Sequence, residues 1–96
     1  MKALSKREVN KFVKKHPEWK VNAKYSQLSR SVSFSSYIDG LIFIARTTVH
    51  AEILSHHPEI TFTANKLVYK LSTKELKSVS KLDTDLAKRI DKILNN

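Results

Sequence analysis

Two adjacent histidines stand where an apolar segment of the sequence is about to end. His56 and His57 follow Glu52 closely, and Pro58 comes directly after them. An imidazole exchanges protons near neutral pH, and the C-terminal end of a helix favours its charged form. Since side chains at i and i+4 share a helix face, we expect Glu52 to contact His56 and to fix its tautomer. His57 can then differ in protonation state, so the segment offers one acid and one base side by side.

Metal binding is another chemistry that is open to histidines. Neighbouring side chains on a helix diverge by about 100°, so His56 and His57 would not hold one ion as histidines at i and i+4 can. His50 and His16 lie further away, and the chain contains no Cys. We therefore predict no metal site and no cysteine chemistry. The plainest alternative is that the two histidines are only the polar end of a helix.

The elements that would position these residues follow from hydrophobic spacing. Ser5 and Glu8 have the spacing of a capping box, and apolar residues then recur at helical period until Pro17. A strand is predicted at 19–21. Apolar and polar residues alternate from 27 to 34, which is the period of a half-buried strand. The first part of the chain therefore predicts a short helix and two antiparallel strands.

The second part of the chain predicts a long helix, a hairpin and a last helix. Helical spacing runs from Tyr37 to Ser55, and a strand begins directly after it. Ala64 and Asn65 make a tight reversal into the returning strand, and Ser80 begins the last helix. The chain predicts one α+β domain over residues 1–96, a four-stranded antiparallel sheet with three helices packed on one face, in the order α-β-β-α-β-β-α.

The long helix carries more apolar surface than one small sheet would cover. One broad stripe continues to Glu52 and His56 and includes Ile38, Leu41, Ile42, Ala45 and Val49. Further apolar residues widen this surface: Phe43, Ile44, Ala51 and Leu54. A second protomer could cover the remainder, so a homodimer or homotetramer is predicted.

Composition restricts the partners and the compartment. Lys and Arg total 18 against 9 Asp and Glu, a formal net charge of +9. Clustered basic residues would indicate nucleic-acid binding, but these are scattered, so a solvated basic surface is favoured and nucleic acid is the alternative. The longest apolar run, 41–45, is too short to cross a bilayer, and the first residues lack the features of a signal peptide. Without Cys, the chain is predicted to be cytoplasmic and free of the membrane.

Several short motifs occur together along nearly the whole chain: Ala51-Glu52, His56-His57-Pro58-Glu59, Asn65-Lys66, Leu71-Ser72-Thr73 and Asp83-x-x-Leu86-Ala87. In this combination the chain resembles the pterin-4a-carbinolamine dehydratases. The resemblance implies dehydration of 4a-hydroxytetrahydropterin, the product of aromatic amino acid hydroxylases, to quinonoid dihydropterin and water. In that family the reaction serves tetrahydrobiopterin recycling and uses acid-base chemistry without a metal or redox cofactor.

The resemblance also implies roles for particular residues. The catalytic residues would be His56, His57 and Glu52. The pterin pocket would be formed by Ser55, His56, His57, Pro58, Ser72, Thr73, Lys74 and Glu75. Trp19 and Asp83 would support the site structurally.

The chain departs from the family pattern at two positions near this pocket. Lys74 stands where the family usually has a histidine or tryptophan, and Ala64 stands where an aromatic residue is expected. A lysine donates hydrogen bonds but accepts protons poorly at neutral pH, so we expect reduced activity. The alternative function is a non-catalytic, oligomerising binding protein on the same fold. The resemblance favours this alternative because animal members of the family also serve as dimerization cofactors of a homeodomain transcription factor.

Overall fold

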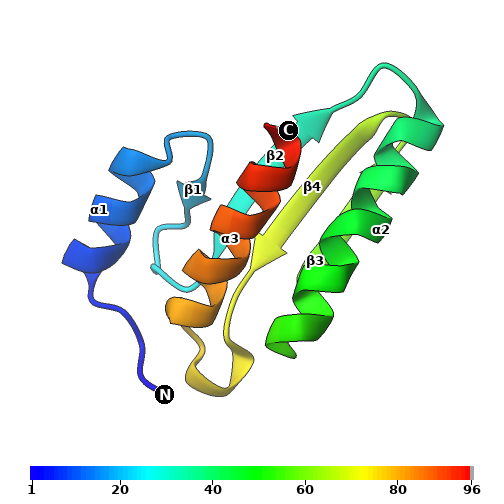
Figure 1. The fold of residues 1–96 in the computed structure, drawn as a ribbon. Helices are drawn as coiled ribbons and strands as arrows, with labels where there is room; N and C mark the ends of the chain where they lie inside the picture. Colours follow the sequence, from blue (N-terminus) through cyan, green and yellow to red (C-terminus); the bar gives the residue numbers. More distant parts are fainter. Residues whose placement is uncertain (96) are drawn as a thin grey trace.

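In the computed structural model, which describes residues 1–95, a four-stranded antiparallel sheet carries three helices on one face (Figure 1). The elements in chain order are α1 (Lys6–Lys15), β1 (Lys20–Val21), β2 (Leu28–Ser33), α2 (Tyr37–Leu54), β3 (Glu59–Thr63), β4 (Lys66–Leu71), a 3-10 turn η1 (Lys74–Leu76) and α3 (Lys81–Leu94). The predicted fold class and the predicted order of helices and strands are confirmed. The turn η1 is an addition to that order.

Strand β4 lies inside the sheet, whose strands are in the order β1-β2-β4-β3. The hairpin between β3 and β4 closes at Ala64, whose φ of 55° lies in the left-handed region that tight reversals use. Side chains alternate along β4, so that the helix-facing residues are fully buried: Leu67, Tyr69 and Leu71. They form the centre of the core together with Trp19, Leu28, Leu86 and Ile90.

Helix α2 has two apolar faces, and the sheet covers only one of them, which agrees with the predicted excess of apolar surface. The buried residues of α2 are Gly40, Phe43, Thr47 and Ala51, so the residues treated as a widening of the stripe lie against the sheet. The stripe itself faces solvent, with exposed fractions of 43–64% for Ile38, Leu41, Ile42 and Val49. Spacing alone finds both faces and does not rank them. No helix among residues 1–95 is both long enough and apolar enough to cross a membrane.

A carboxylate on α3 ties the segment after α1 to the sheet. Trp19 is fully buried, and its Nε1–H donates to Oδ1 of Asp91 at 3.0 Å. Arg30 of β2 forms an ion pair with the same carboxylate, and Nδ1 of His16 lies 3.8 Å from its Oδ2. Because these partners come from three parts of the chain, Asp91 fixes α3 against β2 and the N-terminal segment. Helix α3 is thereby placed at the edge of the candidate site described below.

Helix α2 is tied to the sheet by a pair of buried hydroxyls. The phenol of Tyr69 on β4 hydrogen-bonds the hydroxyl of Thr47 on α2. Burial raises the pKa of Tyr69 to about 12, against the opposing effect of the hydrogen bond to Thr47. The phenol therefore stays neutral inside the fold at pH values that ionise it in the unfolded chain.

We predict that the fold loses stability as the pH rises from about 10 to about 12. The raised pKa of Tyr69 stabilises the fold fully below the unfolded value, and this stabilisation disappears as the pH passes through the folded value. The loss should amount to about 3 kcal/mol, since each pKa unit corresponds to about 1.4 kcal/mol. Urea unfolding across this range measures it.

The matched variants for this test are Tyr69→Phe and Tyr37→Phe. Tyr69→Phe keeps the ring and removes the ionisable group, so its alkaline loss should be smaller than that of the wild type. Tyr37 is an exposed residue of α2, and its replacement should leave the wild-type pH dependence unchanged. An equal alkaline loss in wild type and Tyr69→Phe would contradict the assignment.

Candidate active site

The end of helix α2 sets the directions of the two histidines. The helix ends at Leu54, and Ser55 adopts a left-handed conformation with φ 50° and ψ 41°. The N–H of His56 then donates to the carbonyl of Ala51 at 2.9 Å, which closes the helix end. The chain turns off the helix axis at this point, and Pro58 leads it into β3.

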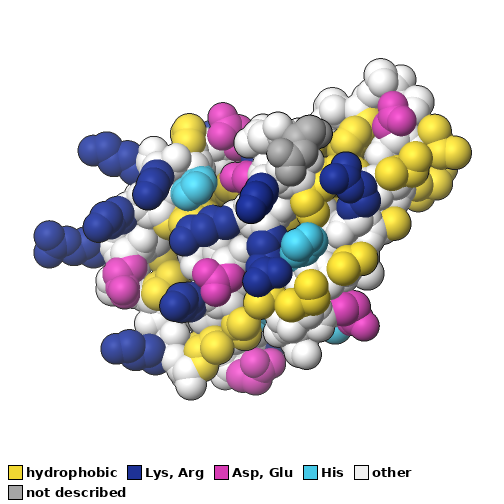
Figure 2. Space-filling model, viewed as in Figure 1, with side chains coloured by type: hydrophobic (Ala, Val, Ile, Leu, Met, Phe, Trp, Pro, Cys, Tyr) yellow, Lys and Arg dark blue, Asp and Glu magenta, His cyan; other side chains and the backbone are white. Residues whose placement is uncertain are grey.

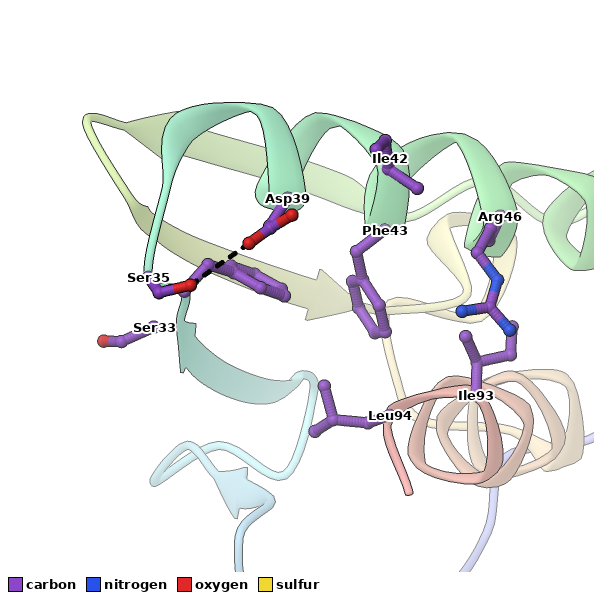
Figure 3. A pocket seen from close by; sticks show the side chains of 9 residues that line it. Ser33, Ser35, Asp39, Ile42, Phe43, Arg46, Ile93 and Leu94 are labelled. Carbon is purple, nitrogen blue, oxygen red and sulfur yellow. Dashed lines mark hydrogen bonds between the residues drawn. The ribbon is translucent and has the colours of Figure 1, made fainter. Parts of the chain in front are cut away.

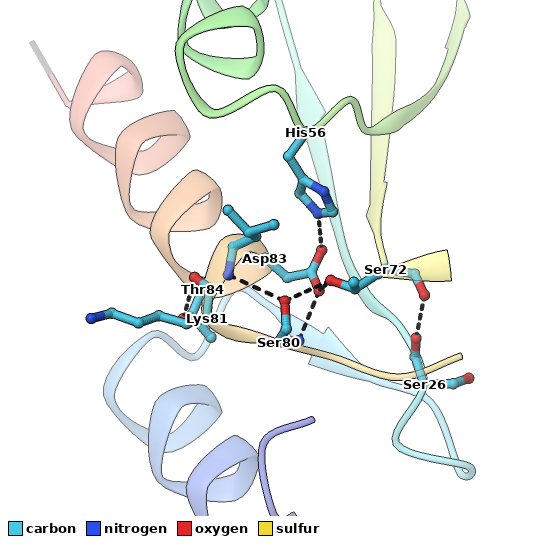
Figure 4. Close-up of polar contacts among 9 residues, drawn as sticks. Ser26, His56, Ser72, Ser80, Lys81, Asp83 and Thr84 are labelled. Carbon is cyan, nitrogen blue, oxygen red and sulfur yellow. Dashed lines mark hydrogen bonds and ion pairs between the residues drawn. The ribbon is translucent and has the colours of Figure 1, made fainter. Parts of the chain in front are cut away.

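His56 is anchored on a buried carboxylate at the start of α3. Its Nε2 lies 2.5 Å from Oδ1 of Asp83, which is fully buried (Figure 4). The second oxygen, Oδ2, accepts a hydrogen bond from the hydroxyl of Thr73 at 2.8 Å and another from the N–H of Ser80 at 2.9 Å. Because a carboxylate only accepts, the neutral His56 ring carries its proton on Nε2. Asp83 therefore fixes both the position and the tautomer of His56.

His57 has a different partner and a different environment. Its Nε2 contacts Oε2 of Glu52, and both side chains are exposed, by 63% and 66%. The side chain of His56 is only 11% exposed. The two imidazoles are thus adjacent in sequence, but one is held inside the fold and the other faces solvent.

The predicted contact between Glu52 and His56 is wrong. The i, i+4 relation holds only while the helix continues, and α2 ends two residues before His56. After the left-handed Ser55, the residue that reaches Glu52 is His57. The carboxylate that serves His56 comes from α3, 27 residues further along the chain.

Two adjoining hollows lie beside the histidines. One of about 270 Å³ is lined by Ser55, His56, His57, Ser72, Lys74, Glu75 and Leu82. The other, of about 420 Å³, is lined by Gln27, His57, Pro58, Glu59, Lys70, Ser72 and Lys74. His57, Ser72 and Lys74 line both, so the hollows form one continuous depression. Ser72 is held in place by donating to the carbonyl of Ser26 at 2.7 Å.

The structure brings together nearly all of the residues that the sequence proposed for the pocket. The exception is Thr73, which is 2% exposed and lines neither hollow. Thr73 lies beyond the end of β4, directly before η1, and its buried hydroxyl holds Asp83. Thr73 therefore positions His56 through Asp83 instead of touching a ligand.

Sequence reasoning missed four lining residues: Gln27, Glu59, Lys70 and Leu82. Glu59 and Lys70 are register partners in the β3–β4 ladder, and their side chains pair at 3.8 Å. Strand register places them beside the depression. The alternation along the returning strand could have indicated Lys70, whereas nothing local indicates Gln27.

Another hollow, of about 400 Å³, lies between the end of β2 and the helices α2 and α3 (Figure 3). Its walls combine apolar side chains such as Phe34 and Phe43 with polar ones, and its carboxylate, Asp39, accepts from the hydroxyl of Ser35 at 3.1 Å. It contains no imidazole and shares no lining residue with the depression beside His56 and His57. Within residues 1–95, no three His, Cys, Asp or Glu converge as a metal site would require. The depression beside His57 is therefore the candidate active site.

Known proteins show the same motifs and the same fold. Residues 2–93 match the family model described as pterin 4 alpha carbinolamine dehydratase. A protein of Prochlorococcus marinus strain AS9601, whose curated name assigns it provisionally as a pterin-4-alpha-carbinolamine dehydratase, is 32% identical over 92 residues, which cover 96% of this chain and 94% of the relative. A protein of Sulfurisphaera tokodaii with the same provisional name is 27% identical over 94 residues, covering 98% and 99%.

Solved structures agree with this relationship. The crystal structure of a transcriptional coactivator/pterin dehydratase from Brucella melitensis has a TM-score of 0.90 at 26% identity and covers 95% of this chain and 97% of its own. A pterin dehydratase-like protein described as a RuBisCO assembly factor in the alpha-carboxysome has a TM-score of 0.68 at 21% identity, covering 79% and 88%, and shows a shared fold alone. With a family match over nearly every residue and relatives that align along almost their whole length, this chain belongs to the pterin-4a-carbinolamine dehydratase family.

Proposed function

We propose that this protein dehydrates 4a-hydroxytetrahydropterin to quinonoid dihydropterin and water by histidine acid-base catalysis, in the recycling of tetrahydrobiopterin. The observation that carries the proposal is the pair of imidazoles at one depression, each with a carboxylate of its own. One pair is buried and the other exposed. Because their environments differ, the two imidazoles can act as acid and base in the same reaction.

The reaction needs two proton transfers. The bond between C4a and the hydroxyl oxygen breaks, and the oxygen leaves as water with a proton from an acid. A ring-nitrogen proton passes to a base, so the sum is the loss of one water molecule. His57 lines both hollows and reaches the whole depression. His56 is held with its proton on Nε2 by Asp83, which leaves Nδ1 of its neutral ring as an acceptor.

The depression suits a neutral, planar ligand. Its lysines, Lys70 and Lys74, are offset by Glu59 and Glu75, so no strong net charge faces the ligand. Ligand pockets usually have volumes of about 300–1,000 Å³. One hollow, of about 420 Å³, lies within this range, and the other, of about 270 Å³, lies just below it. Ser55 and Ser72 offer hydroxyls that can hydrogen-bond a heterocycle.

Lys74 is the residue that we expect to limit the rate. It is exposed and lines both hollows, so it reaches the same ligand as His57. A charged ammonium donates hydrogen bonds and accepts none, so Lys74 can orient a pterin carbonyl but does not replace a third base.

A second candidate function is binding through helix α2 without catalysis. Its supporting observation is the exposed apolar surface of α2, where Ile53 adds to the stripe residues Ile38, Leu41, Ile42 and Val49, since so much exposed apolar surface is unusual on a small monomer. Figure 2 shows hydrophobic side chains along the outer surface of α2. We propose that a second copy of this chain covers the stripe, which gives a homodimer or homotetramer.

The first prediction for the proposed dehydratase function concerns the rate of dehydration. Freshly generated 4a-hydroxytetrahydropterin should lose water faster with the purified protein than without it. His57→Ala should lower the enzymatic rate by about 10²–10⁴-fold, because general acid-base groups contribute that much. Lys74→His should raise it, and the matched control Lys66→His, on an exposed lysine away from the hollows, should not. A wild type no faster than the uncatalysed reaction, with only Lys74→His active, would make binding the main function.

The second prediction concerns Asp83 as a positioning residue. In Asp83→Asn, Thr73 and Ser80 should go on donating hydrogen bonds to the oxygen of the new amide. The NH₂ group of the amide should then face His56. His56 must then accept at Nε2, so its neutral tautomer should reverse and the rate should fall by about 10–100-fold. Nitrogen NMR of the imidazole measures the tautomer. Glu52→Gln is the control, since it contacts His57 and should leave the His56 tautomer unchanged.

The third prediction tests the helix interface. Sedimentation at micromolar protein should show a dimer or tetramer, and Ile42→Glu should shift it toward monomer because it places a charge in the apolar stripe. Lys11→Glu, on an exposed residue of α1, is the control and should not dissociate the assembly. A monomeric wild type would overturn the interface.

A further inference from the structure

Another polar hollow lies between α2 and α3, and we refer to it as the α2–α3 groove. Its volume is about 590 Å³, and it is lined by Arg46, His50, Arg89, Lys92 and Ile93. None of these residues lines the depression beside His57. Figure 2 shows basic side chains gathered around a histidine where α3 faces α2.

One contact across the groove orders two of its side chains. Nη1 of Arg89 lies 3.1 Å from Nδ1 of His50. A guanidinium only donates, so Nδ1 of His50 accepts and the proton of its neutral ring stays on Nε2. His50 therefore offers an N–H donor, while Arg89 keeps further N–H groups beyond the one that it uses. Both side chains are half-buried, so their positions are set by the fold.

The other walls complete a mixed surface. Figure 3 shows the side chain of Arg46 extending from α2 toward Ile93 on α3. Lys92 adds a second cation from α3, and Ile93 supplies an apolar wall. A ligand in the groove would meet two guanidinium groups, one ammonium, one imidazole N–H and a hydrocarbon surface.

The cations of the groove form no ion pair with a carboxylate among residues 1–95, although the neighbouring hollow that shares Arg46 and Ile93 also contains Asp39. The lining contains no Asp or Glu, and the ion pairs of the described chain involve Asp83, Asp91, Glu52 and Glu59 with other partners. Like charges held together repel one another, and an anion between them relieves the repulsion. The groove is therefore suited to a negatively charged ligand.

We propose that the α2–α3 groove is a binding site for a small phosphate-bearing molecule. Guanidinium groups match the geometry of phosphate oxygens and hold them through paired, charge-assisted hydrogen bonds. Three positive charges favour a ligand with more than one negative charge. The volume lies within the usual range for organic ligands, and Ile93 can contact the carbon part of a phosphate ester. This site does not depend on the dehydratase activity.

Titration calorimetry with inorganic pyrophosphate and with phenyl phosphate tests the site, with sodium chloride at matched ionic strength as the reference. Wild type should bind at one site per chain, in the micromolar to low millimolar range. The imidazole signals of His50 should move in NMR, and those of His57 should not. Tighter binding of phenyl phosphate than of pyrophosphate would identify an ester as the ligand, whereas tighter binding of pyrophosphate than of phenyl phosphate would identify an inorganic oxyanion. Either result supports the site.

Matched variants separate this groove from general surface charge. Arg46→Gln with Arg89→Gln should weaken pyrophosphate binding by at least about tenfold. Lys81→Gln with Lys88→Gln removes the same charge from exposed positions of α3 outside the groove, and should keep the affinity within about twofold. Lys92→Gln, at an exposed residue, tests the same site without disturbing the contact between Arg89 and His50, and should also weaken binding.

Several results would overturn the proposal. The first is that the wild type binds none of the phosphate probes. The second is that the groove variants and the α3 control lose affinity equally. The third is that the protein binds a single-stranded oligonucleotide but not the small probes. A groove that binds no probe but whose variants change the sedimentation of the protein would serve contact with a second copy instead.

Discussion

The buried carboxylate of Asp83 is the interaction on which the candidate site depends. Burying a charge is costly unless every lone pair finds a donor. Here the donors come from His56, after α2, from Thr73, after β4, and from the backbone of Ser80 at the start of α3. The N-terminal end of a helix further favours a negative charge at this point. One side chain therefore fixes three segments whose ends form the wall of the depression.

The different surroundings of the two histidines follow from the same geometry. The left-handed Ser55 takes His56 off the helix and directs it to Asp83, so that His57 is left to meet Glu52 at the surface. A helix continued through this point would have placed both imidazoles on its own surface, about 100° apart. The unequal burial that supports acid-base chemistry is thus produced by the way the helix ends.

The sequence indicates the local elements well, and the long-range contacts poorly. Alternation along β4 and the capping residues Ser5 and Ser80 predict elements because each signal lies within a few residues of its effect. The partner of His56 lies 27 residues away, and no spacing rule reaches that far. Thr73 was expected to touch a ligand because it belongs to the same motif as Ser72, but its hydroxyl is buried against Asp83. Helix α2 is apolar on two sides, so its pattern does not decide which side meets the sheet.

The distribution of charge makes the neutral substrate that we propose compatible with a net charge of +9. Around the histidines, Lys70 and Lys74 are offset by Glu59 and Glu75, and each imidazole has its own carboxylate. In the α2–α3 groove, by contrast, the lining contains cations and no acidic residue. Salt screens the attraction of a charged ligand but hardly affects the binding of a neutral one. Ionic strength should therefore act on the groove and leave the depression nearly unaffected, which makes salt dependence a physical distinction between the two sites.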